Sequence, residues 1–98
     1  MPSEETWRLA PGRDLLWQKW PEGGAVFDPA SGNTQFLNLM ACVALERLEG
    51  GPLNAERLTR EVSEYLDIPL DDLLRSNLDS LISHFDSLGL IESCSNTE

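Results

Sequence analysis

The stretch Thr34-Gln-Phe-Leu37 and the apolar repeat from Pro69 to Leu88 decide the fold of this chain. Two strand-like runs, 15–19 and 25–28, precede them, and the connections between the three runs are short. Short connections favour an antiparallel meander whose third strand has one open side. Helical periods follow near residues 39–49, 55–66 and 69–88. The order predicts an α+β fold of the winged helix-turn-helix type, with a three-stranded antiparallel sheet followed by three helices.

The third run is the strand of greatest interest because its free N–H and C=O groups can pair with an added strand. Side chains alternate along a strand, so Thr34 and Phe36 share one face, while Gln35 and Leu37 share the other. The loop that precedes the run, 28–33, contains Gly32 and Asn33, which tolerate the positive φ of a chain reversal.

The helices have recognisable ends. Asn38 and Asn54 are expected to cap the first and second helices, and Pro69 suits the first turn of the third. Gly89 is expected to end the third helix, after which Leu90-Ile91 would fold back onto the core. The apolar stripe of the third helix comprises Leu70, Leu74, Leu78, Leu81, Phe85 and Leu88, widened by Leu73 and Ile82. A stripe this wide is expected to line a groove as well as a core.

Length and composition favour a single domain. The chain has 98 residues, 41% of them hydrophobic, which suffices for one modest core. No run approaches the roughly 20 apolar residues of a membrane span, and the acidic start is unlike a secretory signal. Cys42 is expected to be buried in a helix, and Cys94 to be a free thiol in a polar tail. These features predict a reduced, cytoplasmic protein.

The charge argues against nucleic acid as a partner. The net charge is −10, and residues 39–91 carry ten acids against four bases. In a DNA-binding winged helix the third helix would enter the major groove. Here it offers one base, Arg75, against the acids Asp71, Asp72, Asp79 and Asp86. DNA phosphates need Lys and Arg to neutralise them, so this helix would be repelled.

No residue pattern indicates catalysis, a cofactor or a metal. His84 is the single histidine, and it has no nucleophile or carboxylate at motif spacing. Asp71 and Asp72 are neighbours on a helix and point about 100° apart, so stabilisation of the helix start explains them better than a metal site does. Phosphate loops, zinc spacings and nucleophile elbows are absent from the sequence. Trp7, Trp17 and Trp20 are expected to cover the sheet.

The chain resembles a known family in four places. These are Trp7-Arg-Leu9, Phe27-Asp-Pro-Ala-Ser-Gly-Asn-Thr-Gln-Phe-Leu-Asn38, Gly51-Pro-Leu53 and Leu81-Ile-Ser-His-Phe-Asp-Ser-Leu-Gly-Leu-Ile91. They are similar to PqqD-like proteins, most closely to the subgroup of the HPr-rel-A system. The resemblance covers about residues 7–92, which implies a domain there, a flexible N-terminus at 1–6 and a flexible tail at 93–98.

The resemblance implies a peptide chaperone, a recognition element for ribosomally made, modified peptides. In such domains a precursor's leader adds a strand beside the third strand and packs against the third helix. Carried onto this chain, the peptide-binding residues are Thr34, Gln35, Phe36, Leu37, Leu74, Asn77, Leu78 and Leu81. The implied partners are a leader peptide and a modifying enzyme or an HPr-kinase-like protein.

Two alternatives remain open at this stage. Phe36, Leu74, Leu78 and Leu81 are also ordinary core positions, of which only some need face a ligand. The open edge could instead serve dimerisation, or docking on a kinase-like partner, without any leader peptide.

Overall fold

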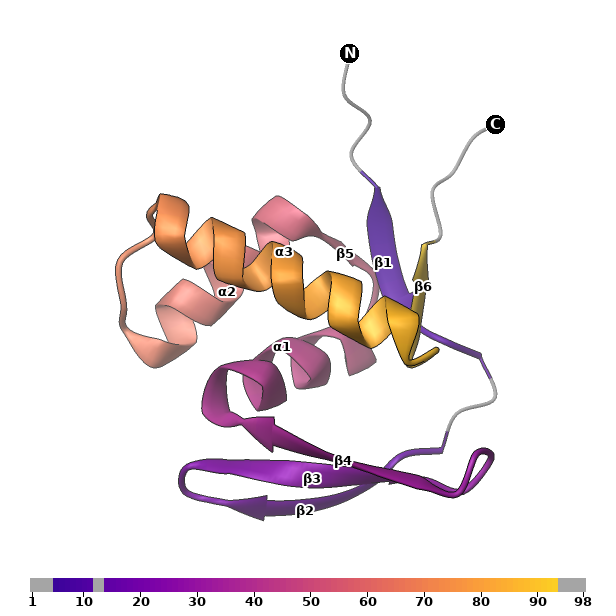
Figure 1. Ribbon diagram of the computed structural model, residues 1–98. Coiled ribbons are helices and arrows are strands. Elements are labelled where there is room, and N and C mark those ends of the chain that lie inside the picture. The colour runs from indigo at the N-terminus through magenta and orange to yellow at the C-terminus, as the bar shows by residue number, and fades with distance from the viewer. Residues whose placement is uncertain (1–4, 12–13, 94–98) are drawn as a thin grey trace.

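A computed structural model describes residues 5–11 and 14–93. Those residues form three helices and two small antiparallel sheets of three strands each (Figure 1). The elements, in chain order, are β1 (Thr6–Leu9), β2 (Leu16–Trp20), β3 (Gly23–Asp28), β4 (Asn33–Asn38), α1 (Leu39–Glu49), β5 (Leu53–Asn54), α2 (Ala55–Leu66), α3 (Asp72–Ser87) and β6 (Ile91–Ser93). The predicted α+β class is confirmed.

The predicted meander is the sheet β2-β3-β4, with β4 at one edge. Both hairpins are antiparallel, and the register pairs Trp17 with Val26 and Val26 with Gln35. These three residues therefore share the inner face, which packs on α1 (Figure 1). Trp17 donates its indole N–H to Glu49 of α1 at 2.9 Å, and Lys19 forms an ion pair with Glu46 of the same helix.

The turn before β4 is held by a buried carboxylate. Asp28 is 4% exposed, and its side chain accepts hydrogen bonds from the Ala30 N–H and the Ser31 hydroxyl. Gly32 adopts φ +78, which favours glycine, and its N–H donates to the Asp28 carbonyl at 2.8 Å. Asn33 has no positive φ and already belongs to β4, so only one of the two residues expected to reverse the chain does so.

The predicted N-caps of the first two helices are confirmed. The side chain of Asn38 accepts from the Ala41 N–H at 2.8 Å, and that of Asn54 accepts from the Arg57 N–H at 2.7 Å. The prediction for Pro69 is wrong, because α3 begins at Asp72. Asp71 is its N-cap and accepts from the Leu74 N–H at 2.9 Å, so a side-chain cap three residues later sets the start of the helix.

The end of α3 follows the prediction. Gly89 has φ +76, and its N–H donates to the Asp86 carbonyl, while the Leu90 N–H donates to the Phe85 carbonyl, both at 3.0 Å. This pair of bonds is a Schellman motif, which turns the chain sharply. Leu90 and Ile91 then fold back and are buried, as expected, and Ile91 begins a strand.

The second sheet, β5-β1-β6, was not predicted. β1 pairs with β5 on one side and with β6 on the other, which joins the two ends of the domain (Figure 1). Arg8 binds Glu92 across this sheet, with its Nε 2.8 Å from a carboxylate oxygen. β1 begins at Thr6 and β6 ends at Ser93, so each takes one residue from a segment expected to be flexible. Residues 1–4 and 94–98, including Cys94, lie outside the described residues.

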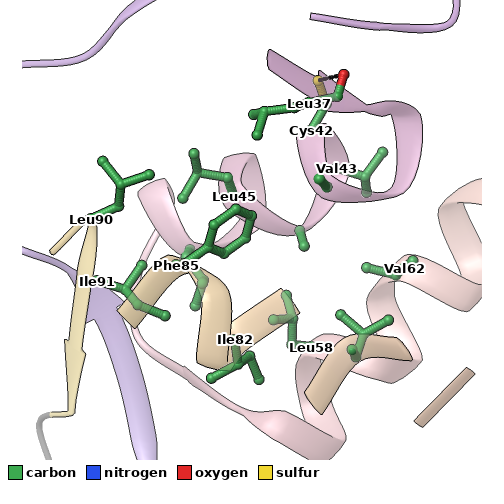
Figure 2. Close-up of a cluster of buried hydrophobic side chains, with 14 of the residues drawn as sticks. Leu37, Cys42, Val43, Leu45, Leu58, Val62, Ile82, Phe85, Leu90 and Ile91 are labelled. Atoms are coloured by element: carbon green, nitrogen blue, oxygen red, sulfur yellow. Dashed lines mark hydrogen bonds between the residues drawn. The ribbon is translucent and has the colours of Figure 1, made fainter. Parts of the chain in front are cut away.

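The core lies where α1 meets the inner face of the sheet on one side and α2 and α3 on the other (Figures 1 and 2). Phe85 of α3 is fully buried between Leu45 and the turn that carries Leu90 and Ile91. The buried residues of α1 are Ala41, Cys42, Val43, Ala44, Leu45 and Leu48. Since they surround the helix, α1 is the centre of the domain.

None of the helices in the described part of the chain is long and apolar enough to cross a membrane.

The close approach of the sheet to α1 predicts a strict requirement for glycine at position 24. A Cβ on Gly24 would lie 2.8 Å from the Gln18 carbonyl oxygen and 3.1 Å from Cys42 Sγ. We expect Gly24→Ala to lower the free energy of unfolding by about 1–3 kcal/mol. Gly50→Ala is the matched control, because Gly50 is in the right-handed helical region and a Cβ there meets nothing closer than 3.4 Å. Urea unfolding of both variants measures the difference; equal midpoints would contradict the packing described.

Candidate functional site

β4 is one of the two edge strands of the β2-β3-β4 sheet. β3 pairs with it on one side, and no other strand of the described residues lies on its second side. Thr34 and Phe36 are exposed on the outer face, Gln35 is half-buried on the inner face, and Leu37 is buried under the sheet. The outward backbone groups of β4 are therefore available to an added strand.

The predicted positions on α3 divide into two groups. Leu74 and Leu78 are 3% and 0% exposed and belong to the core. Asn77 is exposed, and Leu81 is half-buried at the border of the core. The structure thus brings Asn77 and Leu81 to the surface, whereas Leu74 and Leu78 support that surface from beneath.

A shallow, open cleft of about 440 Å³ separates the end of β4 from α3. Its lining comprises Asn38, Met40, Asn77, Ser80, Leu81 and His84. A smaller hollow of about 20 Å³ lies at the other end of β4, where Asn33 and Gln35 meet Leu88 and Leu90. The two hollows place α3 and the turn after it opposite both ends of the edge strand.

Neither wall of this cleft carries Asp, Glu, Lys or Arg. β4 contributes Asn38 to the lining, and α3 contributes Asn77, Ser80, Leu81 and His84. The rest of β4 also lacks Asp, Glu, Lys and Arg. The charged residues of α3 are Asp72, Arg75, Asp79 and Asp86. Arg75 precedes Asn77 by two positions, and Asp79 and Asp86 follow Asn77 and His84 by two. A step of two residues turns a side chain about 200° around the helix, which directs it away from the cleft.

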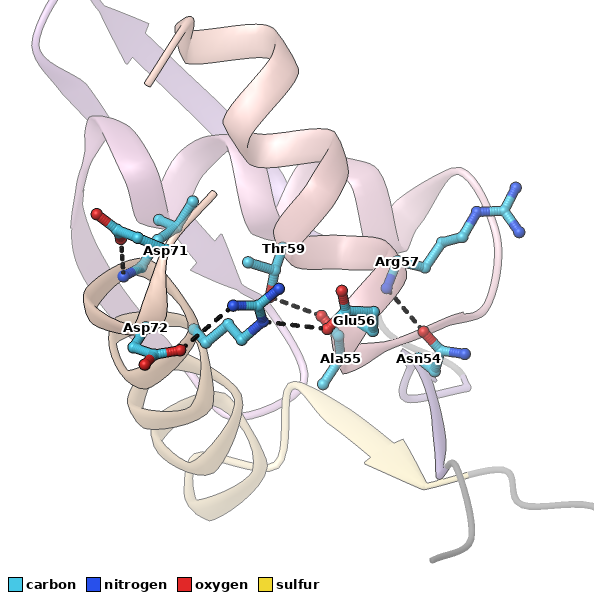
Figure 3. Close-up of polar contacts among 9 residues, drawn as sticks. Asn54, Ala55, Glu56, Arg57, Thr59, Asp71 and Asp72 are labelled. Carbon is cyan, nitrogen blue, oxygen red and sulfur yellow. Dashed lines mark hydrogen bonds and ion pairs between the residues drawn. The ribbon is translucent and has the colours of Figure 1, made fainter. Parts of the chain in front are cut away.

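On the far side of α3, Arg75 forms ion pairs with Asp72 and with Glu56 of α2 (Figure 3). Arg75 lies 3.4 Å from Glu56 of α2 and 3.4 Å from Asp72. The hydrogen bond that Arg75 donates to Glu56 is the largest effect that raises the pKa of Arg75. A cavity of about 350 Å³ lies there, lined by Arg75, Glu56 and Asp79 among others, and within it Arg75 and Glu56 are paired with each other. No group of three metal-ligating side chains occurs in the part of the chain that is described.

The sequence analysis missed four cleft residues as binding positions: Asn38, which it assigned only as a helix cap, Met40, Ser80 and His84. Ser80 and His84 follow Asn77 by three and seven positions, so the helical period would have placed them on the same face once Asn77 was chosen. Met40 lies two residues after the strand, at the start of α1, and no sequence pattern marks it. His84 is exposed, and its backbone carbonyl accepts from the Ser87 hydroxyl at 2.8 Å.

Comparison with protein families, curated proteins and solved structures finds no match to this chain.

The buried thiol of Cys42 gives a test of how tightly the sheet closes over α1. Cys42 is 4% exposed, and burial raises its pKa above the ordinary value of 9.0, with Lys19 acting in the opposite direction. In a Cys94→Ser variant we expect Ellman's reagent to modify Cys42 at least roughly a hundredfold more slowly in the native than in the urea-unfolded protein. Because the Cys42 thiol ionises more readily in the unfolded protein, the free energy of unfolding should fall as the pH rises past about 9. Rapid native modification would show that α1 and β3 separate easily.

Proposed function

We propose that this chain is a non-catalytic peptide-binding adaptor with a winged-helix arrangement. It captures the leader segment of a precursor peptide as a strand added beside β4 and presents it to a modifying enzyme. The proposal rests on one observation: the open, uncharged edge strand β4 ends at a cleft whose α3 wall carries no Asp, Glu, Lys or Arg. The proposed setting is the cytoplasm.

The composition of β4 supports strand addition. Proteins commonly protect exposed edges with charged side chains or proline, which discourage pairing with another chain. The opposite edge strand, β2, contains Lys19, whereas β4 contains neither a charged residue nor proline. The lack of charge on β4 stands out because 24% of the residues of the chain are charged. An unprotected edge beside a cleft is what an extended peptide requires, because the backbone supplies hydrogen bonds and the cleft takes alternate side chains.

The cleft supplies the side-chain contacts of the proposed complex. Every second residue of an added strand would face the cleft, where Leu81 of α3 and Met40 of α1 offer apolar surface and Asn77 of α3 offers an amide. The residues proposed to contact the peptide directly are therefore Thr34, Gln35, Phe36 and Leu37 of β4, together with Asn77 and Leu81 of α3. Leu74 and Leu78 would hold α3 in place from the core.

The resemblance to PqqD-like proteins supports a leader segment as the class of peptide. It implies a leader that adds beside the third strand of the meander, and that strand is β4 here. The proposed enzyme partner is a peptide-modifying enzyme or an HPr-kinase-like protein. Each backbone hydrogen bond contributes about 0.5–1.5 kcal/mol, and ordering a flexible peptide costs several kcal/mol, so binding should be roughly micromolar.

A second candidate is a docking or dimerisation subunit in which β4 pairs with a second copy or with a kinase-like protein. The same uncharged edge supports it. A net charge of −10 on each copy opposes self-pairing, because like charges repel as two copies approach. A mass that rises with concentration in analytical ultracentrifugation, without peptide, would favour this candidate.

The proposal predicts where a peptide perturbs the protein. We expect leader peptides encoded beside the gene to shift the backbone amide signals of residues 33–38 and of 77–84 when added to ¹⁵N-labelled protein. Edge pairing changes the hydrogen bonding of the β4 amides, and side-chain docking changes the surroundings of α3. An absence of shifts at millimolar peptide, with the protein folded, would overturn leader binding.

A matched pair of serines on α3 tests the cleft itself. Ser80 lines the cleft, whereas Ser83, also exposed, does not. We expect Ser80→Trp to fill part of the cleft and weaken peptide binding at least tenfold, and Ser83→Trp to change it less than twofold. Both substitutions lie at the surface, so stability should stay within about 0.5 kcal/mol. Calorimetric titration of both variants measures the effect; equal affinities would place the peptide elsewhere.

A further inference from the structure

The outer face of the β2-β3-β4 sheet, opposite α1, carries large apolar side chains in solvent. Leu16, Trp20, Phe27 and Phe36 are 58%, 41%, 37% and 77% exposed. Phe36 is the most exposed of the four, and it alone lies on the edge strand β4. Its position on β4, the edge strand that ends at the cleft, separates it from the other three.

The register leaves Phe36 with a small neighbour on one side and an open edge on the other. Its partner on β3 is Ala25, which offers a single methyl group, and the next residue across, on β2, is Gln18. On the second side of β4, no strand of the described residues is present. A residue on an added strand, directly opposite Phe36, would have its Cβ about 4.5–5.5 Å from that of Phe36.

We propose that Phe36 is a specificity-determining residue that selects an apolar side chain on the outward face of the bound peptide. This inference rests on the proposed strand addition. Side chains alternate along an added strand, so the residue next to one that enters the cleft points outward, beside Phe36. The ligand class is therefore an uncharged peptide segment with two consecutive large apolar residues, one packed on Leu81 and Met40 and the next on Phe36.

Charge complementarity points to the same class of ligand. β4 and the cleft offer no Asp, Glu, Lys or Arg to pair with a charged side chain of the peptide. The net charge of −10 would in addition repel an acidic segment. An apolar side chain opposite Phe36 gains contact area without desolvating a charge, and cross-strand pairing of this kind should tighten binding about fivefold.

The experiment tests whether replacing Phe36 changes the type of residue that the protein prefers at one position of the peptide. A phage-displayed library of random 12-residue peptides is selected against the immobilised wild-type protein, against Phe36→Lys and against Leu16→Lys. Leu16 is the matched control, because it is exposed on the same face but lies on β2, three strand spacings or roughly 14 Å from an added strand. Both residues are exposed, and lysine is common on edge strands, so both variants should fold.

For the wild type we expect a consensus with two adjacent large apolar residues. Phe36→Lys should replace the outward one by Asp or Glu, which pairs with lysine across the strands, and leave the cleft-facing one unchanged. Leu16→Lys should keep the wild-type consensus. Two outcomes would overturn the inference: a consensus unchanged in Phe36→Lys, or the same change produced by Leu16→Lys.

The failure of this inference is distinguishable from failure of the proposed function. Selected peptides that shift the β4 amides but keep one consensus in all three proteins would remove the role of Phe36 and leave strand addition standing. Selected peptides that shift no β4 amide would overturn both. A wild-type dimer that Phe36→Lys dissociates would assign Phe36 to self-association and overturn the inference.

Discussion

The domain depends on the burial of α1 between the sheet and the other two helices. Leu45 and Leu48 of this helix are 0% and 1% exposed, and Cys42 touches the backbone region of β3 where only glycine fits. Asn38 is both the last residue of β4 and the N-cap of α1, so strand and helix join without a loop. Because α1 cannot move within the core, the direction of β4 and the width of the cleft beside α3 are fixed with it. The open edge is therefore preorganised for a partner, which lowers the entropic cost of binding.

The meander and the helices were predictable because their signals are local. Alternation along the three runs, Asn38 and Asn54 as caps, and Gly89 as a terminator each depend on a few neighbouring residues. The sheet β5-β1-β6 was missed because its strands have two to four residues, too few for a periodic signal, and because β1 pairs with β6 from the far end of the chain. The start of α3 was predicted wrongly from Pro69. A proline is compatible with the first turn of a helix, but the capping carboxylate of Asp71 determines where this helix starts.

The candidate site was predictable in its strand and only partly in its helix. The order of the runs places Thr34–Leu37 at an edge, since the chain leaves the sheet there for α1. On α3, Leu73 and Leu74 are neighbours with the same hydrophobicity, yet they are 70% and 3% exposed. Their difference depends on the position of α1 and α2, which packing sets and a single-helix pattern does not contain. Sequence reasoning therefore found the stripe of α3 but could not separate the residues of the core from those of the cleft.

The distribution of charge separates the two uses to which an open strand edge can be put. Both self-pairing and peptide capture rely on the same unpaired backbone groups of β4. Two copies of the chain each carry a net charge of −10 and therefore repel each other. Arg75 and Arg8 are not available to bridge to a second copy, because each lies within ion-pairing distance of acids of its own chain. An uncharged peptide meets none of this repulsion at β4, because the acids of α3 lie away from the cleft. On the proposed function, acidity elsewhere on the surface disfavours the competing dimer while the uncharged edge stays open to the leader.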